Sequence, residues 1–233
     1  MKDFSHESNE IIERYRRRTQ KDKSCLYNMA KNSVAISRFR FNQELLTLLA
    51  KNFGCDFPLK KYLEVGCGTG NNLSQLISFG VEPKNLMGND IYEPSLEIAK
   101  DRLPSCVELK QGNFVDLKYE KNFDVILFST VLSSILDTDL RKECINKAYD
   151  LLNKDGIIVI YDFTYNNPKN KDVQKVVFHD FFSPGYPKYS KSSVKRITLA
   201  PPIARRLEIL PFLIKLFEKI KILNTHMICF FKK

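Results

Sequence analysis

Three glycines at alternate positions, Gly66, Gly68 and Gly70, follow the short apolar run of residues 62–65. Glycine adopts positive φ angles without cost and has no Cβ, so this spacing suits a loop that turns sharply and lets a ligand approach its backbone. Residues 71–77 then show the spacing of an amphipathic helix, so the segment predicts a strand, a tight loop and a helix. Such a loop typically binds a nucleoside-containing cofactor; the alternative is a glycine turn without a ligand.

The residues around this loop discriminate between cofactors. A dinucleotide-binding loop needs a third glycine where this chain has Asn71, and a phosphate-binding P-loop needs a Lys-Ser/Thr pair that does not follow here. The Glu-x-Gly-x-Gly-x-Gly pattern of residues 64–70 resembles motif I of class I S-adenosylmethionine (SAM)-dependent methyltransferases. The resemblance implies that Glu64, Cys67 and the three glycines bind the cofactor, the loop passing under its methionine part.

Asp90 ends the second expected strand, residues 85–91, and lies 20 residues beyond Gly70. A carboxylate at this position can accept hydrogen bonds from both ribose hydroxyls of an adenosine group. The segment that begins with Asp90 and Ile91 also resembles the family, which has an acid followed by a helix ending in a cation, so both residues are expected at the cofactor. The alternative for Asp90 is the N-cap of the helix that begins near Pro94.

Two further strand ends complete the expected cofactor site. Methyltransferases usually have Gly-Asp after the third strand, with the acid accepting the adenine amino hydrogen, whereas this chain has Asn113 in place of the acid. An amide oxygen can accept the same bond, so Asn113 is expected there, with Phe114 lining the adenine ring. Ser129 lies at the end of the fourth strand, residues 122–130, and is also expected to bind the cofactor.

The same strand end also excludes some reactions. It lacks the Asp/Asn-Pro-Pro-Tyr/Phe motif of base and amide N-methylases, which argues against methylation of those groups. It also lacks the metal-binding aspartate of catechol-type O-methyltransferases, so neither a magnesium-dependent mechanism nor a metal site is expected.

The acceptor side is expected at the end of the fifth strand, residues 157–163. A hydroxyl acceptor must lose its proton as the C–O bond forms, and Asp162 is the first candidate for the base, with Tyr165 and His179 behind it. The alternative for Asp162 is a carboxylate that orders the loop by accepting backbone N–H groups. Most of the acceleration should come from in-line placement against the activated sulfonium. The candidate acceptor-binding residues are Tyr15, Arg17, Asn167 and Arg205.

These residues require a sheet whose strands end at a common edge. The order of the motifs over residues 60–163 predicts an α/β protein with the Rossmann-like, seven-stranded methyltransferase sheet, parallel except for one antiparallel strand. The sixth strand is expected over residues 193–200, and the reversed seventh strand over 226–231.

Helices are expected before and within this sheet. Residues 1–55 are predicted to form an N-terminal helical cap, with a helix from about 34 to 51, and residues 56–233 the methyltransferase domain. A helical insertion over about 201–223, interrupted by Pro211, suits a lid over the acceptor pocket and also suits docking on an anionic membrane surface.

Composition and charge narrow the class of protein. Six cysteines without a CxxC pair and only three histidines suggest neither a zinc site nor a disulfide framework, so a reducing, cytoplasmic location is predicted. The N-terminus does not resemble a signal peptide, and no apolar run is long enough to span a bilayer. The net charge of +10 is unevenly placed: residues 1–40 have ten basic and five acidic residues and residues 191–233 have ten and two, so the middle of the chain is slightly acidic. Such basic ends can meet an anionic acceptor, nucleic acid or a membrane, or keep the protein soluble.

The sequence therefore predicts a SAM-dependent methyltransferase, with S-adenosylhomocysteine as product, that methylates a small or glycan-linked, anionic acceptor on oxygen. Residues 162–168 and 198–206 loosely resemble small bacterial methyltransferases of surface-polysaccharide gene clusters. One alternative is an RNA methyltransferase whose basic ends follow the phosphate backbone. Another is a SAM-binding partner subunit without activity of its own. A monomer and a homodimer are both compatible with the sequence.

Overall fold

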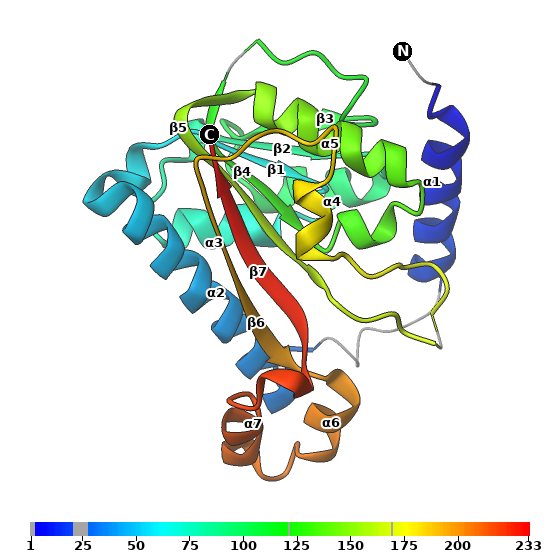
Figure 1. Ribbon diagram of the computed structural model, residues 1–233, viewed down its shortest axis with the longest axis vertical. Helices are drawn as coiled ribbons and strands as arrows, with labels where there is room; N and C mark the ends of the chain where they lie inside the picture. The colour runs from blue at the N-terminus through cyan, green and yellow to red at the C-terminus, as the bar shows by residue number, and fades with distance from the viewer. Residues whose placement is uncertain (1–2, 21–27, 121, 169) are drawn as a thin grey trace.

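The computed structural model describes residues 3–20, 28–120, 122–168 and 170–233 (Figure 1). The strands are β1 (Tyr62–Val65), β2 (Leu86–Asp90), β3 (Glu108–Gln111), β4 (Phe123–Ser129), β5 (Leu152–Phe163), β6 (Lys191–Leu199) and β7 (Asn224–Lys232). The helices are α1 (Ser5–Thr19), α2 (Asn32–Phe53), α3 (Asn71–Ser78), α4 (Glu93–Arg102), α5 (Thr138–Asp150), α6 (Pro201–Arg206) and α7 (Pro211–Phe217).

All seven strands form one sheet in the order β3-β2-β1-β4-β5-β7-β6. The pairs from β3 to β5 are parallel, whereas β7 runs antiparallel to both β5 and β6. The predicted seven-stranded sheet with one reversed strand is thus confirmed. Because β1, β2, β4 and β5 run the same way, the residues that follow them gather at one edge of the sheet.

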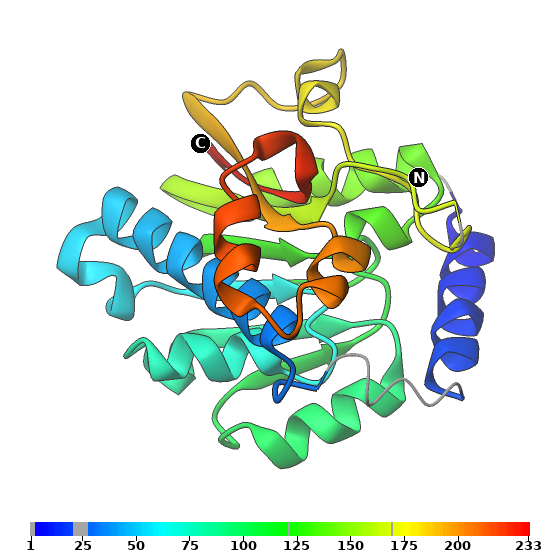
Figure 2. The ribbon, with the colours of Figure 1, turned by 90° about the horizontal axis from the view of Figure 1, so that it is seen from below.

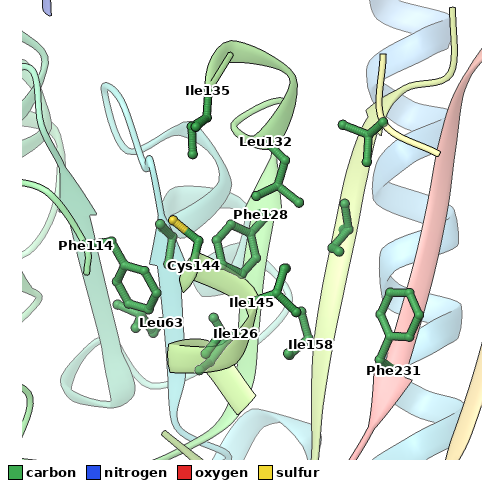
Figure 3. Close-up of a cluster of buried hydrophobic side chains, with 14 of the residues drawn as sticks. Leu63, Phe114, Ile126, Phe128, Leu132, Ile135, Cys144, Ile145, Ile158 and Phe231 are labelled. Carbon is green, nitrogen blue, oxygen red and sulfur yellow. The ribbon is translucent and has the colours of Figure 1, made fainter. Parts of the chain in front are cut away.

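Both faces of the sheet are buried, which explains the nearly continuous apolar sequences of the central strands. Alternate residues of β4 and β5 enter different clusters, since side chains alternate across a strand. One cluster joins the sheet to α1 and α5, and its members include Ile126, Phe128, Cys144, Ile145 and Ile158 (Figure 3). The other joins the opposite face to α2, α3 and α4, and its members include Leu45, Leu73, Leu96, Val125 and Val159.

The two helices of the predicted N-terminal cap lie on opposite faces of the sheet, and the C-terminal helices pack against one of them, α2. On α2, Phe41, Leu45 and Leu49 are fully buried in the same cluster as the sheet. The helices α6 and α7 pack on β6 and α2 through a small cluster of their own, centred on Ala204 and Ile214. Figure 2 shows α6 and α7 in front of the sheet, separate from α1. Within the described ranges, no helix is both long and apolar enough to cross a membrane.

Two element boundaries differ from the sequence prediction. Residues 153–156 have the sequence Asn-Lys-Asp-Gly, which predicts a turn before the fifth strand. They lie instead within β5, which begins at Leu152, because the register with β4 shifts between Phe123 and Val125 and the extra residues form a bulge. Asp155 in this bulge has a φ of 64°. Pro211, expected to interrupt a helix, is instead the first residue of α7, where its missing N–H and fixed φ are tolerated.

Candidate active site

The glycine loop between β1 and α3 has the conformation that its sequence predicts. Gly66, Gly68 and Gly70 have φ angles of 68°, 53° and 76°. A Cβ on Gly66 would lie 2.3 Å from Cγ2 of Val131, and one on Gly70 would lie 2.8 Å from Cδ1 of Leu103. A Cβ on Gly68 would have no neighbour within 4 Å. The outer glycines therefore permit close packing of the chain, while Gly68 leaves open space beside the loop.

Asp90 connects this loop to the tip of β2. Its side chain is only 8% exposed. Its Oδ2 accepts a hydrogen bond from the Gly68 amide at 2.7 Å, and its Oδ1 accepts one from the Tyr92 amide at 2.8 Å. Burial raises the pKa of Asp90, and the backbone N–H groups oppose that shift by stabilising the carboxylate. No side chain caps α4, so the alternative N-cap role of Asp90 is not observed.

The exit of β3 forms the opposite wall. The side-chain amide of Asn113 donates to Oγ of Ser8 on α1 at 3.0 Å, while its oxygen accepts from the Val115 amide at 3.3 Å. Asn89 was not among the residues predicted from the sequence; its side-chain amide donates to the carbonyls of Lys110 at 3.1 Å and Gly112 at 2.9 Å. Asn89 thus holds this wall in place. The sequence feature that could have predicted this role is a polar residue in a buried strand, next to Asp90.

A pocket encloses about 510 Å³ of space not filled by atoms, its open mouth included, at this edge of the sheet. Six of its lining residues were predicted for the site: Tyr15, Gly66, Asp90, Ile91, Asn113 and Phe114. The others were not: Ile11, Val65, Asn89, Gly112, Val131, Ser134, Ile135, Leu140 and Cys144. The walls are mostly apolar with a few polar groups, as expected of a site that binds a flat base and orients it by hydrogen bonds.

These residues fit the adenosine part of SAM. Asp90 supplies a buried carboxylate for two hydroxyls, and Asn113 supplies an amide beside an apolar wall that includes Phe114. The open space at Gly68 leaves room for a ligand against the loop.

Glu64 lies beneath the loop rather than on the pocket wall. It is 1% exposed, and its Oε1 accepts from the Asn72 side-chain amide at 2.5 Å. Its Oε2 has no hydrogen-bond partner among the described residues. Burial raises the pKa of Glu64 to about 8, opposed by the hydrogen bond from Asn72 and the charge of Arg38. Glu64 therefore holds α3 to β1, and its contact with cofactor remains a prediction.

Four other predicted cofactor residues are outside the pocket lining, and one of them is Gly68. Cys67 is buried, and this burial raises the pKa of its thiol. Gly70 precedes α3 and packs on Leu103. Ser129 ends β4 and pairs in register with Tyr161 of β5. Their contacts with cofactor likewise remain predictions.

Asp162, the first candidate for the base, is completely buried in β5. It accepts hydrogen bonds from the backbone amides of Ser133 at 3.0 Å and Phe163 at 2.8 Å. Burial raises its pKa to about 6, and the hydrogen bonds oppose this shift. Asp162 thus fixes the turn that carries two pocket residues, Val131 and Ser134. This geometry favours the ordering role over the role of a base.

The other acceptor-side candidates are not brought together around the pocket. The hydroxyl of Tyr165 accepts from Arg196 at 2.7 Å on the surface. His179 is exposed, with its ring 5.9 Å from that of Phe178, and Asn167 is also exposed.

The two candidate arginines lie on the surface as well. Arg17 faces Asp172 at 3.5 Å on the outside of α1. Arg205 is exposed on α6. Neither residue lines the described pocket.

Helix α1 closes one side of the pocket and is fixed there by a buried ion pair that sequence reasoning missed. Arg14 donates to Oε1 of Glu7 at 2.7 Å and to the carbonyl of Ser134 at 3.2 Å. The same oxygen of Glu7 accepts from the Leu136 amide at 2.8 Å. Tyr15, next on the helix, lines the pocket. The sequence feature that could have predicted this ion pair is the spacing of its acid and its base, which are seven residues apart and so lie on one face of the helix.

The strand order, the glycine loop and the acid at the tip of β2 together define the class I, SAM-dependent methyltransferase fold. The methyltransferase domain family matches residues 56–197, more than half of the chain. The chain therefore belongs to the methyltransferase domain family, and the predicted family, fold and cofactor class are confirmed.

Curated relatives share only part of their length with this chain. An uncharacterized methyltransferase from Bacillus thuringiensis (strain Al Hakam) is 36% identical over 105 residues, 43% of this chain and 45% of the relative. Malonyl-[acyl-carrier protein] O-methyltransferase from Haemophilus ducreyi is 28% identical over 138 residues, 57% of this chain and 51% of the relative. The chain thus spans about half the length of the curated relatives it matches.

Solved structures share the fold over most of the chain. A SAM-dependent methyltransferase from Archaeoglobus fulgidus has a TM-score of 0.59 at 16% identity, covering 91% of this chain and 100% of that one. A putative sarcosine dimethylglycine methyltransferase from Galdieria sulphuraria has a TM-score of 0.60 at 14% identity, covering 86% and 88%.

Proposed function

We propose that this protein transfers the methyl group of SAM to an oxygen atom of a small or glycan-linked, anionic acceptor. The observation that carries the proposal is the buried carboxylate of Asp90, which lines an apolar pocket between the Gly66 turn and Asn113. A carboxylate in this setting suits the recognition of paired hydroxyls in a site that is otherwise built for a flat base.

In this mechanism, the residues of the chain bind SAM and orient it toward the acceptor. When bound, SAM supplies a methyl group already activated by its sulfonium. Asp90 accepts hydrogen bonds from the ribose hydroxyls, and Asn113 binds the edge of the base. Ile11 and Tyr15 of α1 exclude water from one side of the pocket. Alignment of donor and acceptor then provides most of the acceleration.

The titratable groups on the pocket wall support an acceptor that is already ionised. Among the described lining residues, only Tyr15, Asp90 and Cys144 titrate. Burial raises the pKa of Tyr15 and raises that of Cys144 to about 12, so neither accepts a proton near neutral pH. Asp90 is engaged by two backbone amides. A carboxylate oxygen needs no base, and the printed name of the Haemophilus ducreyi relative describes an O-methyltransferase.

The location and assembly of the protein remain predictions. Cys55, Cys67, Cys106, Cys144 and Cys229 are all free thiols, as a reducing compartment would permit, whereas Cys25 lies outside the described residues.

A transfer assay with methyl-labelled SAM tests the proposal. Three acceptor pools are compared: carboxylic acids and their thioesters, anionic glycans and lipid-linked sugars, and RNA. We expect label in one of the first two pools; mild alkali would release it as methanol from a methyl ester but not from a methyl ether.

Two other results would contradict the proposed acceptor class. Label confined to RNA, with binding that falls steeply as salt is added, would make the protein an RNA methyltransferase. If S-adenosylhomocysteine binds but no pool is labelled without a second protein, the chain is a SAM-binding partner subunit.

A further inference from the structure

The segment that carries α6 and α7 presents an unusual surface. Every exposed residue between 201 and 223 is either apolar or basic. The apolar members are Pro202, Ile209, Leu210, Phe212, Leu216, Ile220 and Ile222, and the basic members are Arg205, Arg206, Lys215, Lys219 and Lys221. Ile209 is 91% exposed and Ile222 is 74% exposed. We call this set of residues the α6–α7 surface.

The two acids of the segment are less exposed than the α6–α7 surface, and both accept hydrogen bonds from the backbone of other elements. The carboxylate of Glu208 accepts from the backbone amides of Asn32 and Ser33 at the start of α2, the latter at 3.1 Å. Glu218 is partly buried, and that burial raises its pKa, opposed by a backbone hydrogen bond from Leu199. The exposed charge of the surface is therefore entirely positive.

The exposed apolar residues are not needed to hold the segment in place. A different set of side chains does that on the inner side, with Ala204 and Ile214 buried against Leu199. The segment thus has apolar residues on its inner side and on its outer side, and the rest of the chain covers only the inner side. Contiguous apolar side chains left open to water mark a contact surface.

We propose that the α6–α7 surface docks on a bilayer that contains anionic lipids. Large apolar residues mixed with lysine and arginine are the composition of helices that lie in a membrane interface, where the apolar side chains enter the acyl boundary and the cations meet phosphate headgroups. This inference stands on the surface itself and does not depend on the proposed reaction.

Charge favours a bilayer over a second copy of the chain. In a two-fold dimer the α6–α7 surface of one copy would pack against the α6–α7 surface of the other. The five exposed cations of each copy would then face those of the other. Lysine is also depleted in the cores of protein interfaces, whereas three lysines interrupt this surface.

The α6–α7 surface follows β6, which runs parallel to β5 because both pair antiparallel with β7. It therefore lies at the same edge of the sheet as the pocket, although α1 contributes lining residues to the pocket and α6 and α7 contribute none. Figure 2 shows α6 and α7 apart from α1. Docking would turn this edge toward the lipid.

Sedimentation with vesicles of defined composition tests the inference. The full chain is mixed with vesicles of phosphatidylcholine alone, or of phosphatidylcholine with about 30% phosphatidylglycerol, at low and high salt. We expect the chain to bind the anionic vesicles at least roughly tenfold better than the neutral ones, and salt to weaken the binding.

Two sets of substitutions separate the apolar and the charged contributions. Ile209→Ser with Ile222→Ser should weaken binding at least roughly tenfold, because two side chains lose burial in the acyl region. Replacing Lys215, Lys219 and Lys221 by glutamine should weaken it roughly 100-fold, because each cation near an anionic surface contributes roughly fivefold.

The matched control replaces two exposed apolar residues elsewhere, Leu59→Ser with Ile98→Ser, and should bind as the wild type does. Unchanged thermal unfolding of all variants would show that each still folds, since every substituted side chain is exposed.

Several outcomes would overturn the inference. Equal sedimentation of the wild type with both kinds of vesicle, or sedimentation with neither, would contradict it. Full binding by the Ile209→Ser, Ile222→Ser variant would assign the contact to another basic surface. If that variant instead abolishes a dimer of the wild type in solution, the occupant is a second copy. If it binds vesicles normally but loses methyl transfer, the segment is a lid.

Discussion

At the scale of single residues, the buried carboxyl of Glu64 predicts a specific pH dependence. The folded state keeps the proton of Glu64 up to about pH 8, whereas the unfolded chain releases it near the ordinary value of 4.5. The unfolded state therefore binds fewer protons in this window, and the free energy of unfolding falls as pH rises through it, by up to about 1.4 kcal/mol per pH unit.

Glu64→Gln keeps the shape of the protonated side chain and removes its titration. Urea unfolding between pH 6 and pH 8 should show the wild type losing roughly 2 kcal/mol more than this variant. The exposed Glu143→Gln serves as the control and should follow the wild type. Parallel pH profiles for the wild type and Glu64→Gln would show that Glu64 is ionised in the folded state.

The two possible roles of Asp162 also separate by experiment. Asp162→Ala leaves the buried amides of Ser133 and Phe163 without an acceptor, so it should lower the free energy of unfolding by about 2 kcal/mol or more. Because the turn that Asp162 fixes lines the pocket, S-adenosylhomocysteine should bind more weakly as well. If Asp162 were instead the base, Asp162→Ala would slow methyl transfer but leave the free energy of unfolding and the affinity for S-adenosylhomocysteine unchanged. The exposed Asp101→Ala is the control.

At the scale of elements, α1 depends on its buried ion pair. Arg14→Met leaves the partly buried Glu7 carboxylate without its partner. Breaking a fully buried pair costs about 3–5 kcal/mol, which is the upper limit for this pair. We expect α1 to detach from the sheet more often, with amide hydrogen exchange in residues 5–19 faster by roughly tenfold or more and S-adenosylhomocysteine bound more weakly.

Arg16→Met provides the matched control for this prediction, because Arg16 pairs with Glu13 in an exposed position on the same helix. Exposed pairs contribute about 0–1 kcal/mol, so exchange in α1 should stay near the wild-type rate. If Arg14→Met behaves like Arg16→Met, the ion pair does not hold α1 over the pocket.

The strand ends that form the pocket were easier to predict from the sequence than helix α1 was. The strand tips carrying Gly66, Asp90 and Asn113 were predictable because a β-α-β unit fixes their spacing along the chain. The contribution of α1 was only partly predictable. Tyr15 was expected at the pocket, but Arg14 and Ile11 were not, because the long connection between α1 and β1 sets no register between them.

At the scale of the whole molecule, the fold follows from the sequence, and five residues predicted to bind the cofactor line one pocket, whereas the candidates for the acceptor side are scattered. Four motifs in order determine the sheet. Asp162, Tyr165 and His179 were grouped on the expected acceptor side at the end of β5, yet Asp162 is buried within the strand, whereas Tyr165 and His179 are exposed beyond it. Loop conformation depends on packing between distant segments, which local patterns do not encode.

The pocket between α1 and the tips of β1, β2 and β3 is assigned to the cofactor. Calorimetric titration with S-adenosylhomocysteine tests this assignment most directly, with Asp90→Asn as the variant and the exposed Asp101→Asn as the control. We expect the wild type and the control to bind alike. Asp90→Asn should bind roughly 10- to 150-fold more weakly, because hydrogen bonds to a charged group contribute about 1.5–3 kcal/mol. Equal affinity in Asp90→Asn, or no binding by the wild type, would contradict the assignment of this pocket.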